Sequence, residues 1–191
     1  MKPGTIFKKF RDREGREITL RAPRWSDLDD MLEFINSLVD ENADITVDSK
    51  YTREGEVNWL AGRLSALEND RVIMVAAEVD GRFVGQAAVG PKMGRSKHVG
   101  VLGISLKAGY RDAGIGTELM REVESQAPRL GIEMITLDVF ASNARGRHLY
   151  EKMSYVEVGR VPRGILRDGG YIDDVIMAKQ LKVTPGEAPA E

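Results

Sequence analysis

Hydrophobic residues recur with two different periods along the chain, and the changes of period divide it into strands and helices. Short apolar stretches at 5–10 and 18–21 flank a polar turn at 12–16, a pattern that predicts a β-hairpin. From residue 72 to residue 79 the hydrophobic residues are almost continuous, which is typical of a buried strand. The pattern therefore predicts a charged hairpin at the start and the centre of a sheet further along.

Two segments with helical spacing lie between these strands. Ser26 is expected to be the N-cap of the first helix, whose hydrophobic face runs from Leu28 to Leu38. The second helix is expected to begin at about Thr52, with an apolar face made of Val57, Leu60, Leu64 and Leu67. The polar, non-periodic segment 40–51 between the helices predicts a long loop, and such loops often carry functional residues.

Strands and helices alternate in the second half of the chain. The expected elements are strands over 83–89 and 99–106, a helix over 114–130, a strand over 133–140, a helix over 143–152, and strands over 155–161 and 171–178. The strand–helix–strand unit around Gly114 is expected to be parallel. This order predicts one α/β (α+β) domain over 1–182, with a mixed, twisted sheet of six to seven strands and helices on both faces. Residues 1–16 then form an N-terminal extension or hairpin, and 183–191 a disordered tail.

Composition excludes several classes of function. The chain has 191 residues, which suits one globular domain, and a formal net charge of -2, so no global positive field favours nucleic acid or an anionic membrane as a partner. It has no cysteine, which excludes disulfides, thiolate nucleophiles and Cys-ligated zinc, and only two histidines, so no metal is expected. No apolar signal segment or membrane-length run is present, and a cytoplasmic location is the expectation.

The candidate chemistry lies in a glycine-rich turn between a predicted strand and a predicted helix. The turn reads L-K-A-G-Y-R-D-A-G-I-G-T over 106–117, and backbone N–H groups left open by Gly114 and Gly116 at a helix start can receive a pyrophosphate. Ile115 stands where a Walker A loop needs lysine, and Leu119 stands where a Rossmann fingerprint needs a small residue. Neither of these nucleotide-binding loops therefore fits.

The pattern that does fit is Arg111-x-x-Gly114-x-Gly116, and with it the chain resembles the GNAT superfamily of N-acetyltransferases, whose pattern is (Q/R)-x-x-G-x-(G/A). The same pattern occurs from Arg82 through Gly85 to Ala87, but inside a predicted strand, where no helix start offers free N–H groups. Context therefore selects the copy at Arg111.

A second motif supports the same resemblance, which covers about 18–181. The segment L-D-V-F-A-S-N-A-R-G-R-H-L-Y-E-K-M-S-Y is similar to the superfamily's strand and short helix, with Asn143 opening the helix and Tyr150 following Leu149 on it. Gly146 replaces an alanine of the pattern and is expected to loosen this helix by roughly 0.5–1 kcal/mol. Ser154 replaces the glycine that ends the helix, and Ala108 replaces a proline before the turn. The chain resembles both phosphinothricin-type and ribosomal-protein-type acetyltransferases.

The resemblance implies acetyl-CoA as cosubstrate and places its binding residues. The pantetheine arm is implied to lie in the gap between the strand that ends at Leu106 and the strand over 133–140. It is implied to be held there by the main chain near Ile104 and Leu106 and by Asn143 and Tyr150. The pyrophosphate is implied to bind the loop formed by Arg111, Asp112, Ala113, Gly114, Ile115, Gly116 and Thr117.

The resemblance also implies direct attack of an amine on the thioester, with both substrates bound together. This reaction needs an oxyanion donor, an acid for the thiolate and a base for the amine. We predict the N–H of Leu106 as the donor, Tyr150 as the acid and Asp138 as the base, with Glu41 or Asp44 binding the ammonium group. The acceptor is expected to be a small molecule or a protein lysine or N-terminus, and a homodimer is common in the superfamily.

The residues leave alternatives open. Tyr150 also fits simple packing under the sheet, and Asp138 fits equally well an ion pair with a nearby arginine. The strand before Asp138, over 99–106, has no carboxylate, and His98 at its edge is the only candidate base there. A histidine in such a position is more often a solvent-exposed residue than a base. A non-catalytic acyl-CoA-binding regulatory module would keep the same cofactor loop and perform no transfer.

Overall fold

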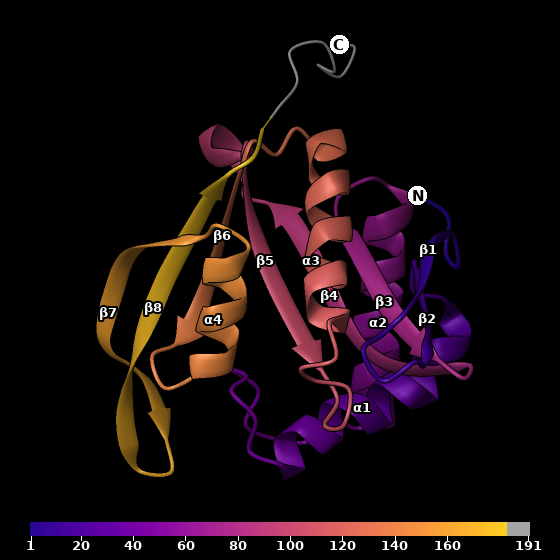
Figure 1. Cartoon of the computed structure of the whole chain (residues 1–191), viewed down its shortest axis with the longest axis horizontal. Coiled ribbons are helices and arrows are strands. Elements are labelled where there is room, and N and C mark those ends of the chain that lie inside the picture. The colour runs from indigo at the N-terminus through magenta and orange to yellow at the C-terminus, as the bar shows by residue number, and fades with distance from the viewer. Residues whose placement is uncertain (183–191) are drawn as a thin grey trace.

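An eight-stranded mixed sheet forms the centre of the molecule (Figure 1). The computed structural model describes residues 1–182, so the predicted tail 183–191 lies outside the described residues. The strand order is β1-β2-β3-β4-β5-β6-β8-β7. The strands are β1 (Ile6–Arg11), β2 (Glu17–Arg21), β3 (Ile73–Val79), β4 (Arg82–Pro91), β5 (Val99–Leu106), β6 (Met134–Phe140), β7 (Val156–Arg167) and β8 (Gly170–Gln180). The predicted fold is confirmed, and both strands of the N-terminal hairpin join the one sheet, which brings the strand number to eight rather than six or seven.

Helices cover both faces of the sheet, each over its own apolar core. The helices are α1 (Leu28–Asp40), α2 (Arg53–Glu68), α3 (Ile115–Gln126) and α4 (Ala144–Lys152), with short 3-10 turns at Trp25–Asp27, Gly94–Ser96 and Ala127–Leu130. Helix α3 buries Ile115, Leu119 and Val123 against one face of the sheet, next to Tyr150 of α4. Helices α1 and α2 bury Phe34 and Leu60 against the other face. The predicted hydrophobic faces thus correspond to two cores, one on each side.

The first helix begins differently from the prediction. Ser26 is not the N-cap: a 3-10 turn at Trp25–Asp27 precedes α1, and Asp27 occupies the cap position. The carboxylate of Asp27 accepts a hydrogen bond from the N–H of Arg24 at 2.9 Å. A buried arginine on β2 binds the same carboxylate, so Asp27 serves both the local turn and the contact with the strand, and α1 begins after Asp27.

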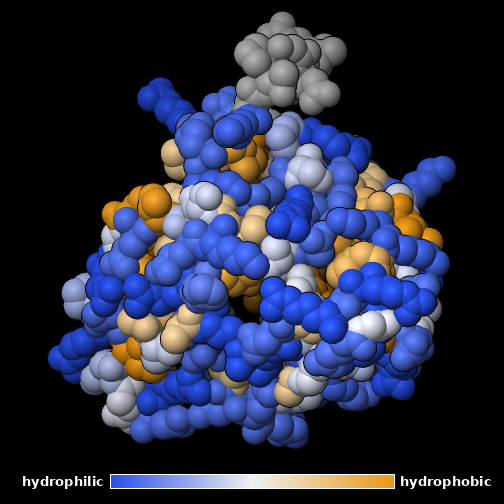
Figure 2. Space-filling model, viewed as in Figure 1, coloured by the Kyte–Doolittle hydropathy of each residue, from blue (hydrophilic) through white to orange (hydrophobic). Residues whose placement is uncertain are grey.

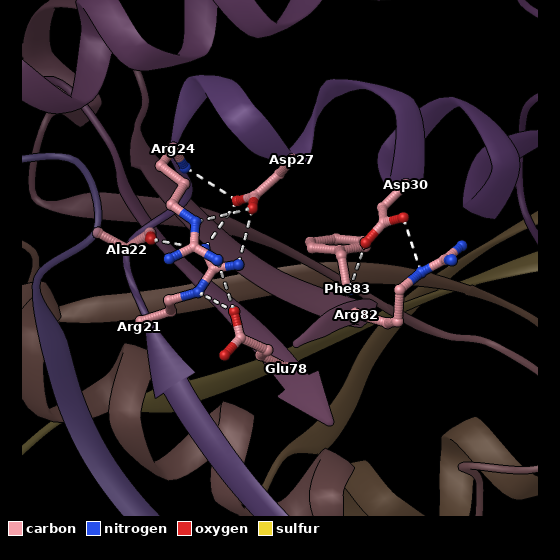
Figure 3. A network of polar contacts seen from close by, with 8 residues as sticks. All are labelled: Arg21, Ala22, Arg24, Asp27, Asp30, Glu78, Arg82 and Phe83. Atoms are coloured by element: carbon pink, nitrogen blue, oxygen red, sulfur yellow. Dashed lines mark hydrogen bonds and ion pairs between the residues drawn. The ribbon is translucent and has the colours of Figure 1, made fainter. Parts of the chain in front are cut away.

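That arginine, Arg21, joins two strands to the start of α1 through a buried ionic network (Figure 3). Its guanidinium donates to both carboxylate oxygens of Asp27 at 2.7 Å and to Glu78 of β3 at 2.8 Å. The side chains of Arg21 and Asp27 are only 2% and 4% exposed. One turn further, Asp30 accepts from the N–H of Phe83 at 3.0 Å and docks α1 on β4. The network therefore sets the direction of α1 and the place where the following loop begins.

Other boundaries follow the local signals. Thr52 caps α2 by accepting from the N–H of Gly55 at 3.1 Å, as predicted. Helix α3 ends at Gln126 and continues only as a 3-10 turn up to Gly131, which has φ +69°. Pro128 lies in this turn and has no N–H to extend the helix. The last hairpin is longer than predicted, because β7 passes through irregularities after Glu157 and Val161 and continues to Arg167.

Candidate active site

A cleft of about 830 Å³ opens between the start of α3, helix α4 and the loop after α1. In Figure 2 the surface is hollowed between α3 and α4, with hydrophilic residues at the rim. Most residues predicted for the cofactor or the acceptor line this cleft together: Glu41, Asp44, Ile104, Leu106, Arg111, Asp112, Gly114, Gly116, Thr117, Asn143 and Tyr150. Residues from distant parts of the chain therefore share one concave site.

The cleft exists because two parallel strands separate. Strands β5 and β6 pair only from Val99 to Val101 with Met134 to Thr136, and β6 then continues beside β8. On the other side of β5, the N–H of Lys107 donates to Val84 of β4 at 2.9 Å. In an antiparallel ladder, hydrogen-bonded pairs alternate with pairs that are not hydrogen-bonded. Lys107 forms a hydrogen-bonded pair with Val84, so Leu106 and Ile104 belong to pairs that are not hydrogen-bonded. Their main-chain N–H and C=O groups therefore point away from β4 and into the gap. The main-chain groups that the prediction assigned to pantetheine thus face the opening between the strands.

Close packing of β4 on β5 fixes this end of the strand. Gly85 lies opposite Leu106, and a Cβ at Gly85 would come within 2.6 Å of the carbonyl oxygen of Ser105. This glycine belongs to the second copy of the sequence pattern, which lies inside β4 as predicted. Its role in the fold is to let Leu106 approach, and it contributes nothing to a phosphate loop.

The glycine-rich turn ends in open N–H groups at the start of α3. Gly114 is the N-cap, has φ +93° and makes no side-chain capping bond. The N–H groups of Ile115, Gly116 and Thr117 find no acceptor in residues 1–182, and the first helical bond is that from Glu118 to Gly114 at 3.2 Å. A helix start of this kind attracts anions through its free donors and its dipole. The side chains of Ala113 and Ile115 are buried in the core, so these two residues can act on a ligand only through their main chain.

Arg111 connects this turn to the end of β5 and to the loop after α1. Its Nε donates to the carbonyl oxygen of Leu106 at 2.8 Å, and its Nη2 forms an ion pair with Glu41. Asp44 is also held, by Arg167 from the tip of the β7–β8 hairpin at 2.6 Å. Neither carboxylate predicted to bind an ammonium group is therefore free, and an incoming cation must compete with an arginine for each of them.

Asn143 and Gly146 start the short helix α4 as a matched pair. The side chain of Asn143 accepts from the N–H of Gly146 at 2.8 Å. A Cβ at Gly146 would lie 2.8 Å from the Asn143 side chain, so an alanine at this position would require the Asn143 side chain to shift. At the other end, Ser154 adopts φ +68°, the left-handed conformation in which the family pattern has glycine.

Tyr150 is buried in α4 and still borders the cleft. Its residue exposure is 7%, and its ring lies 6.1 Å from that of Tyr155. The hydroxyl makes no hydrogen bond to any residue of the described chain, unlike most buried tyrosines. Burial raises the pKa of Tyr150 to about 12. The phenol is therefore neutral at physiological pH and able to donate a hydrogen bond into the cleft.

Asp138 lies on the other face of β6, outside the lining of the cleft and exposed to solvent. Asp138 pairs with Ile176 of β8, and Asp174 of β8 pairs with Phe140. Asp138 and Asp174 are therefore diagonal neighbours on one face of the sheet. Diagonal neighbours on one face are about 7–8 Å apart. Burial and the charge of Asp138 raise the pKa of Asp174. No lysine or arginine of residues 1–182 forms an ion pair with either carboxylate, so the two form an uncompensated acidic pair.

A second hollow of about 390 Å³ adjoins this face. It is bounded by the loop after α1, by Phe140 and by the tip of the β7–β8 hairpin, and it shares Leu38, Asn42, Ala43 and Ile45 with the cleft. The loop therefore separates a cleft on the α3 and α4 side from a hollow on the opposite face. His98 lies at the far end of β5 from Leu106, more than about 20 Å away at about 3.3 Å per residue, and takes no part in either.

Comparison with known proteins identifies the family. Residues 32–155 match the Acetyltransferase (GNAT) family, which is more than half of the chain. The chain belongs to the GNAT acetyltransferase family. YwnH of Bacillus subtilis (strain 168), provisionally named a phosphinothricin acetyltransferase, is 26% identical over 167 residues, 86% of this chain and 99% of that protein. The N-alpha-acetyltransferase of Saccharolobus solfataricus (strain ATCC 35092 / DSM 1617 / JCM 11322 / P2) is 28% identical over 169 residues, 88% of this chain and 96% of that protein.

Solved structures of GNAT acetyltransferases share the fold. The structure of yncA from Salmonella typhimurium, described as a provisional acetyltransferase with its cofactor acetyl-CoA, superposes with a TM-score of 0.77 at 18% identity, covering 91% of this chain and 99% of that one. The predicted resemblance, fold class and enzyme class are thus confirmed.

The residues of this GNAT acetyltransferase fit acetyl-CoA. Gly116 leaves space beside Leu149 and Leu106, because a Cβ there would meet both side chains at 3.3 and 3.4 Å and narrow the passage from α3 to the strand gap. The cleft volume is within the range of small-molecule and cofactor sites. In residues 1–182 no group of His, Asp or Glu side chains could hold a metal ion, and no helix is long and apolar enough to cross a membrane.

Three residues near the GNAT site were missed by sequence reasoning. Arg13 lines the cleft from the N-terminal hairpin, and Arg167 reaches the loop after α1 from the last hairpin. Both lie in or beside turns, where no local pattern indicates a distant contact. Asp174 had a usable signal, because a carboxylate with Ile172 and Ile176 two residues away on either side breaks an alternating apolar face.

Proposed function

We propose that the protein transfers the acetyl group of acetyl-CoA to a primary amine, with both substrates bound at once. The observation that carries this proposal is the alignment of two sets of open main-chain donors along one cleft. The N–H groups at the start of α3 suit the pyrophosphate, and those of Ile104 and Leu106 suit the pantetheine arm and the thioester carbonyl. The solved relative with acetyl-CoA supports the same choice of ligand.

Each chemical role then falls to a residue of this chain. Acetyl-CoA supplies the activated acyl carbon and a thiolate leaving group. As the amine nitrogen bonds to that carbon and the C–S bond breaks, the N–H of Leu106 stabilises negative charge on the carbonyl oxygen. Tyr150 donates a proton to the sulfur, and Asp138, with Asp174 beside it, accepts the proton lost by nitrogen. Exchange with water afterwards restores both groups.

The acidic pair favours an acceptor whose amine loses its proton easily. At pH 7.5, deprotonating a lysine side chain of pKa near 10.4 costs about 4 kcal/mol, whereas an α-amine of pKa near 7.8 costs only about 0.5 kcal/mol. A carboxylate is a weak base, so it assists an α-amine much more effectively than a lysine. The name of the Saccharolobus relative, an N-alpha-acetyltransferase, agrees with this preference. We propose an α-amine, of a small molecule or a peptide, entering from the second hollow.

A thiol-release assay tests the proposed function. The protein is incubated with acetyl-CoA and a panel that contains free amino acids, peptides with a free N-terminus and Nα-acetyl-lysine, and free coenzyme A is measured. We expect release with α-amines at a rate at least tenfold above that with Nα-acetyl-lysine. Binding of acetyl-CoA without release of coenzyme A for any amine would indicate a non-catalytic acyl-CoA-binding module instead. Thermal shift detects the binding in either case, because a bound ligand stabilises either kind of protein.

The role of Asp138 as the base is tested by replacing its carboxylate with an amide. We expect Asp138→Asn to lower kcat at neutral pH by about 10²-fold, with a smaller loss at higher pH where the amine is already neutral. The matched control is Asp173→Asn, because Asp173 is the neighbour of Asp174 and accepts from the N–H of Arg163 at 3.0 Å. This variant should keep kcat within about twofold. An Asp138→Asn enzyme with an unchanged pH profile would exclude Asp138 as the base.

A further inference from the structure

The turn of the N-terminal hairpin contacts the glycine-rich turn directly, although it lies outside the residues that match the family. The N–H of Arg13 donates to the carbonyl oxygen of Ala113 at 3.1 Å. The guanidinium of Arg16 donates to Gly109 at 3.0 Å and lies 4.7 Å from the ring centre of Tyr110. Residues 109–113 are therefore held from outside by a segment almost a hundred residues earlier in the chain.

The hairpin turn is itself firmly built. The carboxylate of Asp12 has no exposed surface and accepts from the N–H groups of Glu14 and Arg16 at 2.9 Å and from the Nε of Arg16 at 2.7 Å. Burial alone would raise the pKa of Asp12, but these hydrogen bonds and the charge of Arg16 lower it. Lys8 also forms an ion pair with Glu118 in the first turn of α3 at 2.6 Å. The backbone of Arg13 is thus fixed relative to the start of α3.

The side chain of Arg13 borders the same cleft as Arg111 and Arg145. Those two arginines already have carboxylate partners, Glu41 and Asp112. The Arg13 side chain forms no ion pair within residues 1–182, and its only hydrogen bond there is a long one to the carbonyl oxygen of Asp112 at 3.4 Å. Most of its donors are consequently available to a ligand at the mouth of the cleft.

We propose that Arg13 binds a phosphate group at the nucleotide end of coenzyme A, as a ligand that the N-terminal hairpin adds to the cofactor loop. The proposal rests on the proposed function for the identity of the cofactor. A guanidinium suits a phosphate because it can donate two parallel, charge-assisted hydrogen bonds. Coenzyme A carries phosphate in two places, the pyrophosphate and the 3′-position of the ribose, and either one is a candidate partner of Arg13.

The test is a calorimetric titration with coenzyme A and with dephospho-coenzyme A, without an amine acceptor. Arg13→Gln keeps the backbone bond to Ala113 and removes the guanidinium with its charge. Arg11→Gln is the matched control, because the Arg11 side chain bonds to Gly15 within the same hairpin at 2.7 Å and does not line the cleft. We expect Arg13→Gln to weaken coenzyme A binding about tenfold at low salt, and less at high salt, with Arg11→Gln unchanged.

The two ligands distinguish the two phosphates. A loss with coenzyme A alone assigns Arg13 to the 3′-phosphate, and an equal loss with both ligands assigns it to the pyrophosphate. Wild-type affinity in Arg13→Gln, or a loss matched by a lower free energy of unfolding, overturns the proposal. A wild-type protein that binds coenzyme A and releases no thiol in the amine assay contradicts the proposed reaction and leaves the binding result for Arg13 standing.

Discussion

Replacing Tyr150 with phenylalanine should lower kcat by about 10²-fold and leave the affinity for coenzyme A almost unchanged. The hydroxyl borders the cleft and is bonded to no residue of the described chain, so its removal costs little packing. Without it, the leaving thiolate receives no proton from the protein as the C–S bond breaks. General acid catalysis typically contributes 10²–10⁴-fold, and the lower end applies because a thiolate is already a fair leaving group.

The raised pKa of Tyr150 determines how this loss depends on pH. A free thiol has a pKa of about 8.5, so in water a phenol of pKa about 12 would protonate a thiolate poorly. The thiolate forms in the same apolar surroundings, however, and burial raises the pKa of a thiol as well. Because Tyr150 remains protonated up to about pH 11, the wild-type rate should not fall through its ionisation between pH 7 and 10. The ratio of wild-type to variant kcat should stay constant over this range.

Tyr155→Phe is the matched control for Tyr150→Phe. Tyr155 is buried beside Tyr150 with an exposure of 2% and does not line the cleft. Its replacement should leave kcat within about twofold. Steady-state turnover and coenzyme A titrations on both variants decide the question. Full turnover in Tyr150→Phe would mean that the thiolate leaves unprotonated or takes its proton from water.

The half of the cleft that we propose for the cofactor was predictable from the sequence because its residues are close together in the chain. A strand, a glycine turn and a helix start within a short segment bring Ile104, Leu106 and Gly114 into one place, whatever the rest of the chain does. The same holds for Asn143, whose cap depends only on the backbone N–H of the residue three positions later. The resemblance to the family rests on these two segments, and the comparison confirms it.

The acceptor half depends on contacts between segments that are far apart in the chain. Glu41 and Asp44 were predicted to bind the ammonium group of the acceptor, and a loop sequence does not show which arginine will reach either carboxylate. In the structure Arg111 and Arg167 hold them, from positions 70 and 123 residues away. Ser26 failed as a cap for a related reason: Asp27, only six residues after Arg21, joins a buried network that Glu78 completes from 57 residues away. Ion pairs of long sequence separation leave no periodic signal.

The largest effect on stability is expected from Asp27→Asn, which should lower the free energy of unfolding by about 3–5 kcal/mol. The variant removes the charge that faces the buried guanidinium of Arg21 and turns an amide N–H₂ toward its donors. Burial alone would lower the pKa of Arg21, but hydrogen bonds and charges from Asp27 and Glu78 raise it in the wild-type protein. In the variant the arginine still stays charged, because a guanidinium is effectively always protonated in proteins. Glu78 alone then compensates a charge that is almost fully removed from water. Such a loss is a large part of the 5–15 kcal/mol typical of a domain.

Asp29→Asn provides the matched control on the same helix turn. Asp29 forms an ion pair with Arg53 at 3.2 Å, but the two side chains are 79% and 64% exposed. An exposed pair of this kind contributes about 0–1 kcal/mol, so Asp29→Asn should unfold at nearly the wild-type urea concentration. Equilibrium urea unfolding at pH 7 measures all three proteins. An equal loss of stability in Asp27→Asn and Asp29→Asn would contradict the prediction. It would mean that water reaches Arg21 in the variant and that the buried network does not hold α1 in place. If the expected loss is found, the buried ion pair at the start of α1 is a main contributor to the stability of the fold that carries the cleft.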